Sequence, residues 1–192
     1  MGTIGSVGVM NAPVLRQWRD ADLEPLAEMS ADPEVMRYFL APLTRAEAQD
    51  FLTWLRTMID QRRWGIWAVD VDGDFAGMVG LNVPRWPLPF SPCTEVLWRL
   101  RQKYWGKGVV HAAASQAVAY GFERVGLDEI VAFTTPPNLR SIRLMERLGF
   151  ARDHSGDFDH PAVPERHPLR RHVLYRLNLD SAVESLVFHG KC

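Results

Sequence analysis

Two glycines and two lysines stand together in mid-chain, in a pattern that could bind an anion. Residues 102–110 read Gln-Lys-Tyr-Trp-Gly-Lys-Gly-Val-Val, which places Gly106 and Gly108 beside Lys103 and Lys107. An apolar run precedes the segment and an alanine-rich helical pattern follows it, so the expected order is strand, glycine loop, helix. Glycines let a backbone approach a ligand closely, and the first turn of a helix offers unpaired N–H groups and a positive dipole end. The spacing therefore predicts an anion site, although an ordinary strand-to-helix turn would use the same residues.

The spacing excludes two familiar phosphate loops. A nucleotide triphosphatase loop needs Gly-x-x-x-x-Gly-Lys-Ser/Thr, which the chain lacks. The dinucleotide fingerprint Gly-x-Gly-x-x-Gly needs a third glycine at the position of His111. The pattern that the chain does contain is Lys103-x-x-Gly106-x-Gly108.

This loop resembles the coenzyme A pyrophosphate loop of the GNAT superfamily of N-acetyltransferases. It is most similar to the RimJ/RimL-type branch, whose loops often read Tyr-Trp-Gly-Lys-Gly. Residues 138–150 read Asn-Leu-Arg-Ser-Ile-Arg-Leu-Met-Glu-Arg-Leu-Gly-Phe and resemble that family's Asn-x-x-Ser helix, which ends in Leu-Gly-Phe. The resemblance covers roughly residues 14–179. The chain departs from the family at Lys103, where Arg or Gln is usual, and at Ala112, where Glu is frequent, but neither change removes a backbone donor.

The resemblance implies acetyl-coenzyme A as co-substrate and no metal. In that fold the pantetheine arm enters a V-shaped gap between two splayed strands, and the pyrophosphate lies at the loop. The residues that the resemblance assigns to the cofactor are Trp98, Leu100, Lys103, Trp105, Gly106, Lys107, Gly108, Val109, Asn138 and Ser141. The acidic and histidine-containing stretch 153–160 has no ligand pair on a helix, which argues against a metal site there.

The implied reaction is direct transfer of an acetyl group to a primary amine, which needs a base because free amines are mostly protonated near neutral pH. Glu95 is the candidate base. It shares a strand face with Leu97 in the otherwise apolar run before the loop, an unusual place for a carboxylate without a role or a partner. A solvated strand glutamate is the alternative. His160 and His172 are reserve candidates for the base or for substrate binding.

Ser141 is the candidate acid for the departing thiolate, one turn into the helix that Asn138 should cap. A serine that only satisfies local backbone groups is the alternative. The acceptor stays open between a protein N-terminal α-amine and the amine of a small molecule. A coenzyme A-binding sensor without catalysis and a GNAT-like structural subunit are the other functional hypotheses. The resemblance also allows a homodimer, since dimers are common among relatives.

Composition favours one compact domain. The resemblance implies that this is a single N-acetyltransferase domain over residues 1–192, with a flexible lead-in at 1–12 and an appendage of unknown role at 180–192. The chain has 192 residues, 47% of them hydrophobic, which is enough for a sizeable core. A formal net charge of −1 argues against nucleic acid as a partner. Cys93 and Cys192 are too few for a disulfide framework, so we expect a cytoplasmic location. No apolar run is long enough to span a membrane.

Alternating strands and helices should position these side chains. We expect strands at 14–18, 65–70, 75–83, 94–100, 129–134 and 171–177, and helices at 20–30, 44–62, 109–125 and 138–148, with a short helix near 35–39 and a polar loop over 151–171. This order predicts a mixed α/β sheet with helices on both faces. The resemblance adds that the sheet is mostly antiparallel and splayed at the cofactor site.

Overall fold

A single seven-stranded sheet organises the computed structural model, which describes residues 11–180. The strand order is β1-β2-β3-β4-β5-β7-β6. The strands are β1 (Val14–Arg16), β2 (Ile66–Val71), β3 (Asp74–Asn82), β4 (Glu95–Leu100), β5 (Glu129–Thr134), β6 (Ala151–Asp159) and β7 (Arg171–Asn178). Every neighbouring pair is antiparallel except β4 and β5. The predicted mixed, mostly antiparallel sheet is confirmed. Nearly all of the expected lead-in and appendage lies outside the described residues.

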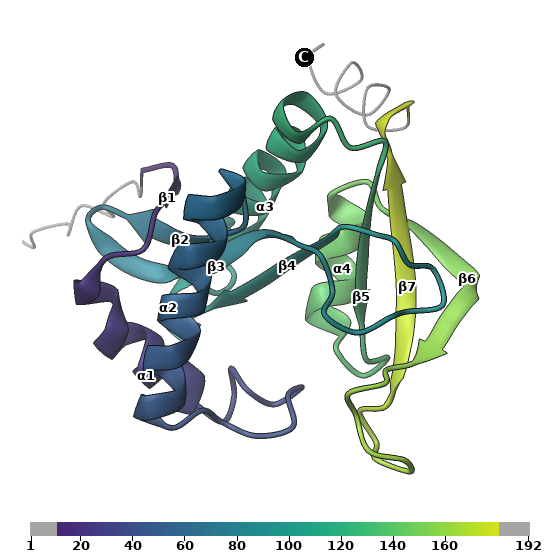
Figure 1. Ribbon diagram of the computed structural model, residues 1–192, viewed down its shortest axis with the longest axis horizontal. Coiled ribbons are helices and arrows are strands. Elements are labelled where there is room, and N and C mark those ends of the chain that lie inside the picture. Colours follow the sequence, from purple (N-terminus) through teal and green to yellow (C-terminus); the bar gives the residue numbers. More distant parts are fainter. Residues whose placement is uncertain (1–10, 181–192) are drawn as a thin grey trace, which may run out of the picture.

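Helices cover both faces of the sheet, as predicted. They are α1 (Leu23–Ala31), α2 (Arg45–Arg62), α3 (Val109–Tyr120) and α4 (Leu139–Arg147). Figure 1 shows α1 and α2 in front of the half of the sheet that contains β2 and β3, with α3 behind it and α4 behind β5 and β7. Within residues 11–180, no helix combines the length and the apolar character needed to cross a bilayer.

The hydrophobic core has two parts that meet at the junction of β4 and β5. One part packs β2 and β3 against α1, α2 and α3, with Leu55 and Ala113 fully buried. The other packs β5 and β7 against α4 and the end of α3, includes Val96 of β4, and buries Ile130 and Met145. Trp98 of β4 contacts both parts. Trp98 therefore lies where the two parts of the core adjoin.

Several local signals form as the sequence predicts. Thr44 caps α2 in a capping box, accepting the Glu47 N–H at 3.2 Å, while the Glu47 carboxylate accepts the Thr44 N–H at 2.7 Å. The Asp72-Gly73 hairpin joins β2 to β3. Gly149 follows α4 with a φ of 87°, the left-handed conformation that favours glycine after a helix. The short helix expected near 35–39 is absent from this segment, which forms consecutive turns instead.

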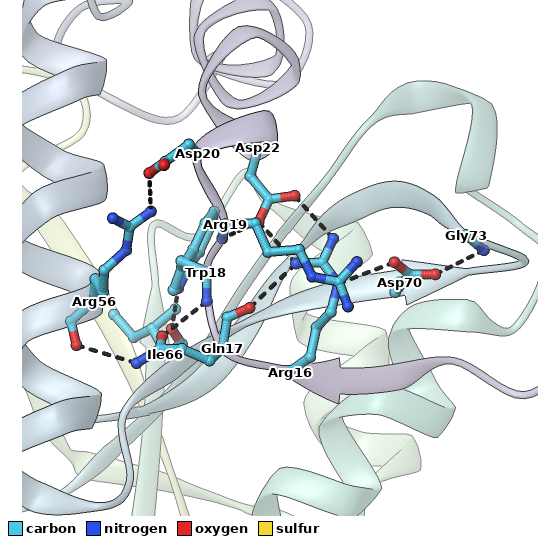
Figure 2. A network of polar contacts seen from close by, with 10 residues as sticks. All are labelled: Arg16, Gln17, Trp18, Arg19, Asp20, Asp22, Arg56, Ile66, Asp70 and Gly73. Atoms are coloured by element: carbon cyan, nitrogen blue, oxygen red, sulfur yellow. Dashed lines mark hydrogen bonds and ion pairs between the residues drawn. The ribbon is translucent and has the colours of Figure 1, made fainter.

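The expected cap at Asp20 is wrong. A single 3₁₀ turn, Asp20–Asp22, precedes α1, and the Asp22 carboxylate accepts the backbone N–H of Arg19 at 2.7 Å. Figure 2 shows Arg16 between two carboxylates, with its Nη1 2.7 Å from Asp22 and its Nε 3.0 Å from Asp70. These contacts fix the start of α1 to the β2–β3 hairpin, so the tertiary ion pairs decide where the turn begins.

In the same network Asp20 turns outward and pairs with Arg56 of α2 at 2.8 Å (Figure 2). The Trp18 indole is buried and donates to the Ile66 carbonyl at 2.8 Å, which ties the segment after β1 to β2.

The expectation of a polar loop over 151–171 is also wrong for its first half, because residues 151–159 form β6. This edge strand pairs with β7 and carries a register shift between Asp153 and Phe158. Its charged side chains find partners nearby: Arg152 Nη2 lies 2.7 Å from Asp157, and Asp153 accepts Arg176 Nε at 2.8 Å. Pairing across the sheet edge compensates for a sequence with little strand character.

Candidate active site

The parallel strands β4 and β5 separate almost as soon as they meet. Their pairing is limited to Glu95 with Val131, supported by the Val131 N–H donating to the Thr94 carbonyl at 2.9 Å. From there the rest of each strand runs on without pairing to the other. The structure thus contains the splayed strand pair that the family resemblance implied, and the gap opens toward the glycine loop.

The glycine loop lies at the end of β4 and leads directly into α3. Gly106 has a φ of 71° and Gly108, the N-cap of α3, has a φ of 78°. Both angles lie in the left-handed region, which glycine adopts without steric cost. A Cβ at either position would meet no other atom within 4 Å, so the space over the loop is open. Helical bonding starts where the Ala112 N–H reaches the Gly108 carbonyl at 3.1 Å, which leaves the preceding N–H groups of the first turn for an anion.

The two lysines of the loop differ in whether a carboxylate already pairs with them. Lys103 pairs with Asp74, whose pKa is lowered because hydrogen bonds from Lys103 and Tyr104 outweigh the effect of burial. Lys107 is exposed, and within residues 11–180 it forms no ion pair. Of the two predicted cations, Lys107 is therefore the one whose charge is available to a phosphate.

An arginine and a tryptophan meet across the gap. The Trp105 indole donates to the Leu100 carbonyl at 2.9 Å, which folds the loop back onto the end of β4. The guanidinium of Arg140, from α4, lies over the Trp105 ring at 4.5 Å from its centroid. The loop and α4 thus contact each other beside the mouth of the gap. No motif in the sequence singled out Arg140.

Ser141 projects from the first turn of α4 toward β4. Asn138 caps the helix by accepting the Ser141 N–H at 3.3 Å, and its amide nitrogen donates to Thr134 Oγ1 at 3.0 Å. The Ser141 hydroxyl accepts the Trp98 indole N–H at 3.2 Å. Because an indole can only donate, this bond uses a lone pair of Ser141 and leaves its own hydroxyl hydrogen free to donate elsewhere.

Glu95 lies at the narrow end of the gap, on the face opposite to Trp98, since residues three apart on a strand point to opposite sides. Its Oε1 accepts the Asn82 side-chain amide at 2.8 Å. Burial raises the pKa of Glu95 to about 7, and the bond from Asn82 opposes that rise. A small part of the residue stays accessible although its carboxylate is closely surrounded. A carboxyl that titrates near neutral pH can take up a proton from an amine.

The two reserve histidines lie together in an aromatic cluster around Phe133 of β5. His160 and His172 are 5.0 Å apart between ring centroids and pack against Phe133 and Phe158. Burial, and then the charge of His172, lowers the pKa of His160 to about 4, and burial also lowers the pKa of His172. Both lowered pKa values make these rings weaker bases than an ordinary histidine, so Glu95 is the better candidate for the catalytic base.

The described residues contain no group of three or more His, Cys, Asp or Glu side chains that could hold a metal ion. In the stretch 153–160, Asp153 and Asp157 are committed to arginines instead.

Sequence reasoning missed Asn82, the cross-strand neighbour of Glu95. Asn82 ends β3 as the one polar residue of an apolar run, and this change of polarity was the available signal. A twelve-residue connection separates it from β4, so the register that brings the two side chains together could not be deduced from spacing.

Comparisons with known proteins agree with this fold. Residues 14–151 match the family model described as "Acetyltransferase (GNAT) domain". A relative from Aspergillus fumigatus named "FsC-acetyl coenzyme A-N(2)-transacetylase" is 33% identical over 129 residues, covering 64% of this chain and 55% of the relative. The chain thus spans about half of that relative's length.

Solved structures share the fold at lower identity. An acetyltransferase of the GNAT family from Bacillus anthracis is 22% identical with a TM-score of 0.71, over 88% of this chain and 96% of the other. Mycobacterium smegmatis RimJ, solved in complex with CoA-disulfide, is 20% identical with a TM-score of 0.69, over 93% of this chain and 90% of the other. At these identities the likeness shows a shared fold and nothing more.

Proposed function

Because this chain belongs to the GNAT family of N-acetyltransferases and takes acetyl-coenzyme A as its co-substrate, we propose that it transfers the acetyl group to a primary amine by direct attack. The acceptor amine is the N-terminal α-amine of a protein or the amine of a small molecule. The observation that carries this proposal is the placement of two side chains beside the β4–β5 gap. Glu95 lies where the two strands pair, and Ser141 of α4 binds Trp98 of β4, on the opposite face of the sheet.

The cofactor side of the proposal rests on the loop and α3. The left-handed backbone at Gly106 and Gly108 and the open space above them fit a pyrophosphate, which the first-turn N–H groups and Lys107 would bind. We assign Trp98, Leu100 and Val109 to the same cofactor path, together with Asn138, which caps the first turn of α4. Lys103 contributes less, because Asp74 already neutralises it.

In the proposed reaction Glu95 takes a proton from the amine, whose nitrogen forms a bond to the acetyl carbon. Backbone N–H groups of β4 polarise the thioester carbonyl. As the carbon–sulfur bond breaks, Ser141 donates its hydroxyl proton to the sulfur, and solvent later restores the protonation of both side chains. Ionised Glu95 is the active form, so the rate should rise as pH passes through about 7.

The proposal also covers the branch of the family, the cellular location and the oligomeric state. We place the chain in the RimJ/RimL-like branch, on its Tyr-Trp-Gly-Lys-Gly loop, and in the cytoplasm, as a monomer or a homodimer.

A thiol-release assay tests the proposed function. The purified chain is supplied with acetyl-coenzyme A and a panel of peptides with free N-termini, amino acids, polyamines and aminoglycosides. We expect thiol release that depends on the amine for at least one class. Tight coenzyme A binding without release on any amine would instead identify a sensor, and the absence of binding would identify a structural subunit.

A further inference from the structure

A pocket on the Glu95 side of the sheet is separate from the cofactor loop. It has a volume of about 200 Å³ and lies between the second half of α2 and the start of the β3–β4 connection. The lining residues that matter here are Trp54, Met58, Arg62, Asn82 and Arg85. Because ligand sites for drug-sized molecules usually measure ~300–1,000 Å³, this pocket fits a smaller group, about the size of one amino acid.

The inner end of the pocket is connected to the candidate base. Asn82 is 8% exposed, and its amide nitrogen donates to Glu95 Oε1 at 2.8 Å. An ionised carboxylate can only accept, so the amide nitrogen must face Glu95 and the amide oxygen must face away from it. That oxygen, Asn82 Oδ1, is buried without a hydrogen-bond partner among the described residues. A buried acceptor without a partner is unfavourable, and an N–H group of a bound amine would satisfy it.

The outer end of the pocket is positively charged. Arg62 and Arg85 line it, and none of the lining residues is a carboxylate. In the part of the chain that the structure describes, neither arginine forms an ion pair, and Arg62 only stacks over Trp64 at 5.7 Å from the ring centroid. Guanidinium groups recognise carboxylates through paired N–H donors, and they repel an ammonium group.

We propose that this pocket binds the acceptor and that the acceptor is a small amino-acid-like compound, with a carboxylate near its primary amine. The amine donates one N–H to Asn82 Oδ1 and presents another to Glu95, while the carboxylate lies between Arg62 and Arg85. This assignment rests on the proposed acetyl transfer and narrows its acceptor to an anionic amine, which disfavours polyamines.

The first test compares acceptors. Thiol release is measured with amino acids, with the corresponding amino-acid amides and with spermidine, at equal concentrations of neutral amine. We expect kcat/KM for the amino acids to exceed that for their amides by about tenfold or more, because only the acids reach the arginines. Short peptides with an acidic first residue are tested as well, because they carry a carboxylate near an N-terminal amine. Thiol release with these peptides would identify a protein N-terminus, and not a free compound, as the source of the carboxylate. Amides or spermidine used as well as the acids would overturn the inference and leave the proposed function standing.

The second test removes the charges. In the double variant Arg62→Gln/Arg85→Gln, KM for an amino acid should rise about tenfold, while KM for acetyl-coenzyme A and the rate with an amide stay unchanged. Arg63→Gln is the matched control, since it removes a neighbouring exposed charge outside the pocket. A double variant that behaves like Arg63→Gln would contradict the role of the two arginines.

The third test addresses Asn82. Asn82→Ala should raise KM for the acceptor and lower kcat, with KM for acetyl-coenzyme A unchanged, because the variant loses the acceptor for the amine and the partner of Glu95. Unchanged kinetics would show that the free amide oxygen does not contact the amine. The absence of thiol release from wild-type protein with any amine would remove both this inference and the proposed function.

Discussion

Glu95 combines a carboxylate with a closely packed site, and this combination determines how it responds to pH. Burial raises its pKa to about 7, so the folded chain holds this proton more tightly than the unfolded chain does. A raised carboxyl pKa means that the folded state loses stability as pH rises from about 4.3, the ordinary value of a glutamate, through 7. Burial of Glu95 therefore makes the folded state less stable at neutral pH, but it provides a carboxylate that can accept a proton there.

The Glu95→Gln variant keeps the size of the side chain and removes its charge. We expect kcat/KM to fall by roughly a hundredfold near pH 7, because the amine then lacks its base. The loss should shrink as pH approaches the pKa of the amine, and earlier for an α-amine, near about 8, than for a lysine-type amine, near about 10.4. Pre-steady-state and steady-state rates from pH 6 to 10 measure this.

Glu123→Gln is a suitable control for that variant, because Glu123 is exposed on the turn after α3. A pH profile of Glu95→Gln that runs parallel to wild type, without recovery at high pH, would make Glu95 a substrate-positioning residue. His160 and His172 would then be the next bases to test.

Ser141→Ala deletes one hydroxyl and leaves the backbone N–H that Asn138 caps. We expect kcat to fall while coenzyme A affinity holds, because a proton for the departing thiolate matters only in the transition state. Ser115→Ala is the matched control: this serine of α3 donates to its own helix, to the His111 carbonyl at 2.9 Å. Equal kcat values for the two variants would leave Ser141 with a structural role only.

At the scale of elements, the turn from β4 into α3 combines two left-handed glycines with the free N–H groups of a helix start. Gly108→Val should abolish coenzyme A binding, because the new side chain occupies the open space over the loop and strains the backbone. Isothermal titration with coenzyme A measures the affinity, and circular dichroism checks that the fold survives.

Gly126 offers a closely matched control for this change. Its φ of 76° is nearly that of Gly108, and a Cβ there also meets nothing within 4 Å, but it lies beyond the far end of α3. Gly126→Val therefore carries the same backbone strain away from the loop. If both variants bind coenzyme A as wild type does, the loop is not part of the cofactor site.

At the scale of the whole molecule, the two halves of the sheet meet through the single β4–β5 pairing of Glu95 with Val131. A cofactor held by the loop on one half and by α4 on the other would connect the two parts of the core. Coenzyme A at a hundred times its Kd should add about 2.7 kcal/mol to the stability, which corresponds to about 5–10 °C in Tm for a chain of this size. Differential scanning fluorimetry measures the shift, and the Gly108→Val variant should lose it. An unchanged wild-type Tm at saturating coenzyme A would contradict binding across the gap.

The sequence alone predicted the features that depend on short stretches of backbone. The glycine loop at 106–108 and the Asn138 cap each follow from conformations that a few adjacent residues determine, so their spacing was informative. The strand of Glu95 and the alternation of strands with helices were predictable in the same way. The resemblance supplied the splayed pair, which periodicity by itself could not.

Only the tertiary structure decided the contacts between distant segments. Asn82 meets Glu95 because β3 and β4 pair in one particular register across a twelve-residue connection, and many packed side chains jointly determine that register. Likewise, residues 151–159 become a strand because β7 offers an edge to pair with, although their own composition favours a loop. The pocket beside Asn82 exists only once α2 covers that face of the sheet. Such features depend on the sum of many weak, non-local contacts, and no spacing of residues along the chain encodes that sum.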